Sequence, residues 1–251
     1  MNEEITAQKS TELFPEEALK DLVEAGVFFG RRKSKANPKM KQYVLTNRGG
    51  IEIIDLHKTL EGMEAVLNFV FEKVKAGGLI LFVATQPQAV QAIKEISEEF
   101  NYPWVATRWL GGILTNFRII ARRIDQFKKL RSDLASGAFD RYTKKERVII
   151  DSQIQKMDGL FGGLQTLNRL PDLVVVIDPN VHHTAIREAR RMKIPTVVFA
   201  NVDSDPDMLD YFVAGNNKAR KSINWFLGEV KKAILKGKAA VPVVVPPKVE
   251  I

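Results

Sequence analysis

Short apolar runs alternate with longer amphipathic segments along most of the chain. Five of the runs have the length and composition of buried strands, and they span residues 51–56, 79–84, 104–106, 173–177 and 196–200. Runs that are apolar throughout are typical of parallel sheets covered on both faces. Segments with helical spacing of apolar residues lie around them, at residues 15–25, 58–76, 87–100, 182–192 and 216–235. The pattern predicts an α/β fold with a parallel sheet between two layers of helices.

Residues 114–167 interrupt this alternation, because the segment is too long for a simple crossover between two strands. Two sets of apolar residues in it follow helical spacing, and they are Phe117, Ile120, Ile124, Phe127, Leu130 and Leu134, and then Ile150, Ile154, Met157, Phe161 and Leu164. Thr143 and Glu146 have the spacing of a capping box at the start of the second helix. We expect an antiparallel hairpin with helices of about 18 residues, or about 27 Å. The alternative is two helices lying flat on the sheet, and the polar outer faces favour projection.

The expected organisation has four parts. A short N-terminal tail (residues 1–12) precedes an α/β domain in two pieces (13–112 and 168–236), and a coiled-coil hairpin (113–167) is inserted between the pieces. The C-terminal segment (237–251) is rich in proline and valine, which indicates an extended tail.

The composition is that of a soluble globular chain. Apolar residues make up 45% of the 251 residues and charged residues 27%, and no apolar run approaches the roughly 18 residues that a membrane span needs. The start of the chain is polar and acidic, unlike a secretory signal, so we expect a cytoplasmic location. The chain has no cysteine, which excludes disulfides, thiolate catalysis and cysteine-based zinc sites.

The net charge is +8, and the cations are concentrated in three segments. Residues 31–48 contain seven Lys or Arg residues and no acid, and Asn37-Pro38 interrupts any regular element, which predicts an exposed basic loop. The predicted hairpin and the last helix carry further cations, namely Arg118, Arg122, Arg123, Lys128, Lys129, Arg131, Lys218, Arg220, Lys221, Lys231 and Lys232. One charged helix face is usually just solvated, but an acid-free loop is less easily explained in that way. Cations that neutralise phosphates give strong, salt-dependent binding, and Tyr43 offers a ring for base stacking, so the distribution indicates binding to structured RNA.

A nucleotide site at the carboxyl ends of the strands is the main alternative, because parallel α/β sheets often bind ligands there. Such a site would make the chain a nucleotide-binding enzyme or regulator. The sequence after the second apolar run is Thr85-Gln86-Pro87-Gln88, which lacks a glycine-rich turn for phosphates, and no P-loop pattern occurs. Gly111-Gly112 and Gly162-Gly163 flank the predicted hairpin, where turns or close packing explain them more simply. We therefore expect no cofactor and no small-molecule substrate.

Two groups of residues match metal sites only in part. His182 and His183 are adjacent, and neighbours on a helix point about 100° apart, so they cannot share one ion there. Aspartates at alternate positions in residues 203–207 match the opening of a calcium loop, but Met208 and Ala214 replace its glycine and glutamate. We interpret these aspartates as caps in a turn, and we predict neither metal ligands nor catalytic residues.

Several distinctive stretches are spread over nearly the whole chain. They include Asn37-Pro38-Lys39-Met40, Gly50-Ile51 with Ile54-Asp55-Leu56, and the run from Arg108 to Phe117. Others are the run from Asp140 to Glu146, Leu170-Pro171-Asp172, Asp178-Pro179, Arg187-Glu188-Ala189, Ile194-Pro195, Asp205-Pro206-Asp207 and Gly215-Asn216. Together these stretches resemble hallmark sequences of the bacterial ribosomal protein S2 family.

The resemblance implies a flavodoxin-like parallel sheet of five strands with a projecting coiled-coil hairpin. It also implies a structural constituent of the small ribosomal subunit that binds small-subunit ribosomal RNA near the junction of head and body, with no catalysis. The implied protein partners are neighbouring small-subunit ribosomal proteins, including ribosomal protein S1.

The chain departs from the family pattern near its N-terminus. Residues 28–31 read Phe-Phe-Gly-Arg where His-Phe-Gly-His is usual, and Ala36 stands where a tryptophan usually precedes Asn37. We therefore expect no contact through a metal or a histidine in this region, and we expect Arg31 to contact a phosphate instead.

The candidate RNA-binding residues form two groups. The basic segment contributes Arg31, Arg32, Lys33, Lys35, Lys39, Lys41 and Arg48, and the base of the hairpin contributes Arg108, Asn116, Arg118 and Arg122. Contacts from such residues to phosphates position a protein on RNA without reading its sequence.

Overall fold

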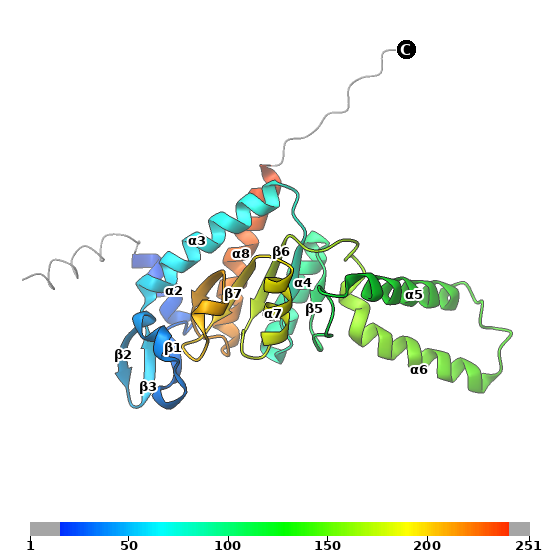
Figure 1. Ribbon diagram of the computed structural model, residues 1–251, viewed down its shortest axis with the longest axis horizontal. Helices are drawn as coiled ribbons and strands as arrows, with labels where there is room; N and C mark the ends of the chain where they lie inside the picture. Colours follow the sequence, from blue (N-terminus) through cyan, green and yellow to red (C-terminus); the bar gives the residue numbers. More distant parts are fainter. Residues whose placement is uncertain (1–15, 241–251) are drawn as a thin grey trace, which may run out of the picture.

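The computed structural model describes residues 16–240, which form a parallel sheet and a smaller antiparallel sheet (Figure 1). The parallel sheet has five strands in the order β5-β4-β6-β7-β8, which are Trp104–Val105, Ile80–Val83, Leu173–Ile177, Thr196–Ala200 and Tyr211–Ala214. This mixed α/β arrangement fits the flavodoxin-like fold. The strand order reverses between β4 and β6, so the topological switch point lies at their carboxyl ends.

The strand predicted at residues 51–56 belongs to the other sheet, so its placement in the parallel sheet is wrong. β3 (Ile51–Ile54) pairs antiparallel with β1 (Phe29–Arg32) and β2 (Val44–Arg48). Its side chains alternate between exposed and buried positions, as in a sheet with one face in solvent. The fifth parallel strand is β8, a short run that the apolar pattern did not single out.

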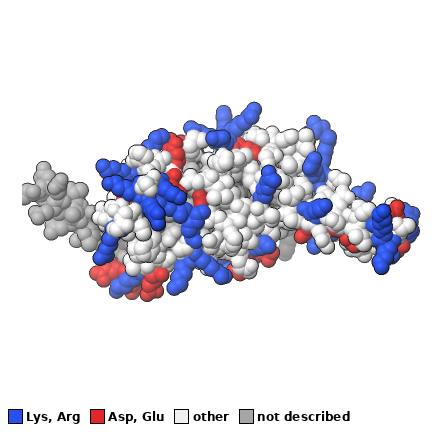
Figure 2. Space-filling view, turned by 90° about the horizontal axis from the view of Figure 1, so that it is seen from below, with Lys and Arg blue, Asp and Glu red and all other residues white. Residues whose placement is uncertain are grey.

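The prediction of an exposed basic loop at residues 31–48 is also wrong in its secondary structure. β1 and β2 occupy the two ends, and 3-10 helices at Lys33–Lys35 and Pro38–Tyr43 lie between them. Gly49 and Gly50 turn the chain from β2 into β3 with φ of 60° and 80°, which glycine adopts without strain. β1 and β2 can form with few buried apolar side chains, because both are edge strands of a partly solvated sheet. Figure 2 shows Lys and Arg side chains gathered at the end of the molecule that carries the small antiparallel sheet.

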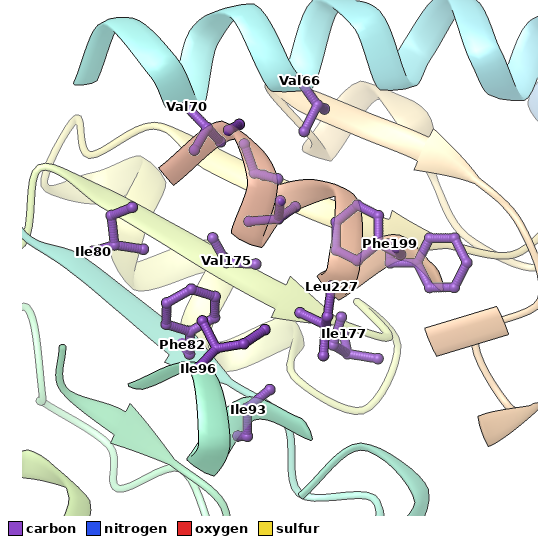
Figure 3. Packing of buried hydrophobic residues seen from close by; sticks show 14 of the residues in the cluster. Val66, Val70, Ile80, Phe82, Ile93, Ile96, Val175, Ile177, Phe199 and Leu227 are labelled. Carbon is purple, nitrogen blue, oxygen red and sulfur yellow. The ribbon is translucent and has the colours of Figure 1, made fainter. Parts of the chain in front are cut away.

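Helices cover both faces of the parallel sheet. On one face lie α2 (Glu16–Glu24), α3 (Leu56–Lys75), α4 (Pro87–Phe100) and α8 (Arg220–Ala239). On the other lie α7 (His183–Arg191) and parts of α5 (Phe117–Ala135) and α6 (Lys144–Phe161). Alternate residues of each strand supply the two cores, so that Val175 packs toward α8 while Val174 and Val176 pack toward α7. Figure 3 shows the first core, in which Phe82 lies beside Ile96, and Leu227 lies beside Ile177.

The inserted segment carries α5 and α6, which extend away from the sheet beyond β5 (Figure 1). The capping box is confirmed, because Thr143 N donates to Glu146 Oε2 at 2.9 Å and the Thr143 hydroxyl caps Glu146 N. The two helices share buried apolar side chains, which are Ile120, Ile124 and Phe127 of α5 and Ile154 and Phe161 of α6. We call α5, α6 and the turn between them the arm.

The last helix continues to Ala239, past Gly237, where the extended tail was expected to begin. A Cβ atom at Gly237 would lie 2.8 Å from Val74 Cβ, so this glycine lets α8 approach α3 closely instead of ending the helix. The predicted N-terminal tail (1–12) lies outside the described residues, and so do residues 241–251 of the predicted C-terminal tail (237–251). Between residues 16 and 240, no helix is long and apolar enough to cross a membrane.

We predict that two glycines of α8 respond to alanine with opposite signs. Gly228→Ala should raise the free energy of unfolding by about 1 kcal/mol, because the new Cβ meets nothing within 4 Å and alanine favours the helix. Gly237→Ala should lower it by about 1 kcal/mol, because the contact with Val74 becomes overpacked. Urea denaturation measures both changes, and stabilisation by both substitutions would contradict the close α3–α8 contact.

Candidate nucleic-acid interface

The cations of residues 31–48 fall into two classes. Those with exposed side chains and no ion pair among residues 16–240 are Arg32, Lys33, Lys35, Lys41 and Arg48. They lie on the small antiparallel sheet and on the 3-10 turns between its strands. We call these five residues the sheet cations.

Arg31 belongs to the second class, because it is bound by residues of the same chain. Its Nε donates to Asp203 Oδ2 at 3.2 Å, and its Nη2 donates to Asn217 Oδ1 at 3.4 Å. These partners follow β7 and β8, so Arg31 links the small sheet to the parallel sheet. With acceptors already in place, its geometry favours a positioning role over a contact with phosphate.

Lys39 is also paired within the chain, although it is exposed. Its Nζ lies 3.0 Å from Asp205 Oδ1 and also contacts Asp207 Oδ2. Hydrogen bonds to Asp207 and Asp205 raise the pKa of Lys39 above its ordinary value. The interpretation of Asp205 as a cap is confirmed, because its Oδ1 accepts from Asp207 N at 3.2 Å.

The small sheet is held firmly against the parallel sheet. Asn37 N donates to Val202 O at 2.8 Å, and a separate apolar cluster joins Met40 and Ile54 to Val202 and Ala214. The sheet cations therefore stand on a fixed support, although their own side chains are solvated.

The second group of candidate residues lies at the base of the arm. Arg108 follows β5, and Asn116, Arg118 and Arg122 belong to the start of α5. All four side chains are exposed, and Arg118 and Arg122 share one helix face because they are four residues apart. We call these four residues the arm-base group.

Glu188 of α7 holds the segment that leads from β5 into α5. Its Oε1 accepts from Gly112 N at 2.8 Å and from Trp109 Nε1 at 3.0 Å. Its Oε2 accepts from Leu114 N at 3.1 Å and from Thr115, through N at 3.2 Å and Oγ1 at 3.1 Å. Five donors thus converge on one carboxylate that is only 8% exposed.

Burial by itself would raise the pKa of Glu188, but the hydrogen bonds from Gly112, Trp109, Thr115 and Leu114 outweigh it and lower the pKa. The carboxylate is therefore charged at neutral pH. Reasoning from the sequence did not identify this residue as a structural anchor. The available signal was an acid beside the buried Ala185 and Ala189 on an otherwise apolar helix face.

The carboxyl ends of β4 and β6, where a ligand binds in this topology, are occupied by side chains of the chain itself. Asp178 Oδ2 accepts from Gln86 Nε2 at 2.6 Å and from Lys218 Nζ at 2.7 Å. Asp178 is 2% exposed, so its carboxylate is removed from solvent, whereas the Lys218 side chain is 38% exposed. The arrangement holds the strand ends together and offers no glycine-rich cradle for a nucleotide.

The two histidines do not form a shared site. His182 is buried, with Nδ1 donating to Asp178 O at 3.0 Å and Nε2 accepting from Thr85 N at 3.2 Å, whereas His183 is exposed. Burial lowers the pKa of His182, which keeps its ring neutral. Among the described residues, no group of three or more His, Asp or Glu side chains is placed to hold a metal ion.

The family model described as ribosomal protein S2 matches residues 22–237 of this chain. The chain belongs to the ribosomal protein S2 family. The small ribosomal subunit protein uS2 of Thermus thermophilus is 39% identical over 223 residues, which cover 89% of this chain and 87% of the relative. The corresponding protein of Corynebacterium kroppenstedtii is also 39% identical over 223 residues, covering 88% and 78%. The resemblance read from the motifs is therefore confirmed. The S2 family consists of structural proteins and not of enzymes, so the enzyme alternative is wrong.

We predict that Glu188→Gln lowers the free energy of unfolding by about 3 kcal/mol, because an amide cannot accept from five donors and brings donors of its own. Urea denaturation measures the loss. Glu72→Gln, at an exposed carboxylate of α3 without an ion pair among the described residues, is the control and should change stability by less than about 0.5 kcal/mol. Equal effects of the two substitutions would contradict the anchoring role.

The contribution of Glu188 should also depend on pH. Its pKa is lower in the folded chain than the ordinary value of 4.5, so its stabilisation is complete above that pH and is lost as the pH falls through the folded pKa. The stability difference between the wild type and Glu188→Gln should be constant near neutral pH and shrink below about pH 4.5. A difference that persists unchanged to about pH 2 would show that the charge contributes nothing.

Proposed function

We propose that this S2-family chain is a structural constituent of the bacterial small ribosomal subunit, located in the cytoplasm, and that it supports translation by binding small-subunit ribosomal RNA. The observation that carries the proposal is the set of exposed cations, without an ion pair among residues 16–240, on the small sheet and at the base of the arm. Lys and Arg side chains that are solvated and fixed in position suit the phosphates of a folded RNA.

The proposed contact surface consists of the sheet cations and the arm-base group. Arg31 and Lys39 have a positioning role and do not contact RNA themselves, because their ion pairs with residues 203–207 hold the small sheet in place. Internal acids thus separate the cations that position the surface from those that meet phosphates.

We also propose the organisation expected from the sequence, with an α/β domain at residues 13–112 and 168–236 and a coiled-coil hairpin at 113–167. The arm has exposed apolar side chains as well as cations, including Val148 (61% exposed) and Ile149 (58%) on α6. This mixture favours contact with neighbouring small-subunit proteins in addition to RNA, and ribosomal protein S1 is one proposed partner.

RNA binding should separate the two classes of arginine. Arg32→Ala should reduce the slope of log K against log salt by about one, because one phosphate contact is lost. Arg31→Ala should leave the slope unchanged and lower the free energy of unfolding by about 1 kcal/mol, because its bonds to Asp203 and Asn217 disappear. Titrations with purified small-subunit ribosomal RNA at several salt concentrations measure the slopes.

Lys20→Ala on α2 is the control for charge loss outside the proposed surface. The proposal fails if Arg32→Ala and Lys20→Ala leave identical slopes. A reduced slope for Arg31→Ala would instead place its guanidinium among the phosphate contacts.

A further inference from the structure

A cavity of about 310 Å³ lies where the arm joins the parallel sheet. Its walls are β5 with the residues that follow it as far as Arg108, Lys94 of α4, Arg131 and Asp158 of the arm, and the Gly162-Gly163 turn after α6. Of the residues singled out for RNA contact from the sequence, Arg108 is the one that lines it. We call this cavity the arm-base pocket.

The pocket is positively charged, with three cations against one acid. Arg108 is exposed and has no ion pair among residues 16–240. Lys94 Nζ lies 4.9 Å from the centroid of the Trp104 ring, and the described residues include no acid paired with it. Arg131 Nη1 is 3.9 Å from Asp158 Oδ1, and both side chains are more than half exposed, so this pair is weak.

The glycine turn keeps one wall of the pocket free of side chains. A Cβ atom at Gly163 would lie 2.3 Å from Trp104 Cδ2, so the backbone packs directly against the ring. Gln165 Nε2 donates to Gly162 O at 2.8 Å and fixes the turn. The result is a shaped, polar cavity with cations on both the sheet side and the arm side.

We propose that the arm-base pocket binds a phosphodiester group of RNA, with Lys94 and Arg108 on one side and Arg131 on the other. Guanidinium groups suit phosphate oxygens because their donors match them in pairs. An RNA backbone seated here bridges the body and the arm and thereby fixes the direction of the arm. This inference rests on the proposed RNA-binding function and adds a specific site to it.

The first test is a double substitution, Lys94→Gln with Arg131→Gln, which leaves Arg108 intact. The slope of log K against log salt should fall by about one, and binding at about 0.1 M salt should weaken about tenfold. Lys20→Gln with Arg191→Gln removes the same charge from α2 and from the far end of α7 and should change affinity less than about twofold. Asp158→Asn removes the competing acid and should tighten binding.

Two outcomes separate the pocket from the wider function. If the pocket variant matches its control while Arg32→Ala still reduces the slope, the pocket proposal is overturned and RNA binding stands. If neither the pocket variant nor Arg32→Ala changes RNA binding, the proposed function fails as well.

The tryptophans provide a direct readout, since Trp104 lines the pocket, Trp109 is held by Glu188 and Trp225 lies on α8. In NMR spectra of the intact chain, the indole signal of Trp104 should shift on addition of a small-subunit RNA fragment while the signal of Trp225 stays fixed. Inorganic phosphate should produce the same shift only at far higher concentration. A shift with inorganic phosphate and none with RNA would assign the pocket to a free ion and overturn the proposal.

Discussion

The buried carboxylate of Glu188 determines where the arm begins. The segment between β5 and α5 has no regular secondary structure, so its backbone N–H groups need acceptors once they are buried. Glu188 supplies acceptors for three of these N–H groups and for the side chains of Trp109 and Thr115. The start of α5 and the position of the arm-base group depend on this contact with α7.

A second constraint decides which cations remain available to a partner. The acidic turn at residues 203–207 neutralises Arg31 and Lys39, and the same bonds hold the small sheet on the ends of β7 and β8. The net charge of +8 therefore does not show where phosphates are attracted, because it counts paired and unpaired cations alike. The proposed interface consists of the cations that have no acidic partner among the described residues. Arg32 belongs to it, whereas its neighbour Arg31 is paired with Asp203.

Local patterns in the sequence predicted the α/β class, three central strands and the capping box at Thr143, because continuous apolar runs and capping motifs are local signals. The motifs also identified the S2 family. The partners of β3, the strand β8 and the anchoring role of Glu188 were missed, since they depend on contacts between distant segments. The bond between Arg31 and Asp203 joins positions 172 residues apart, and no periodicity reports such a pair. The role of Gly237 was misread for the same reason, because its close neighbour is Val74 on another helix.

Co-sedimentation of the tagged chain with small ribosomal subunits tests whether it is a constituent of these subunits. We predict stoichiometric association at moderate salt and release at high salt, because phosphate contacts weaken as counterions compete. A folded chain that remains free of small subunits at moderate salt would contradict the proposed ribosomal role.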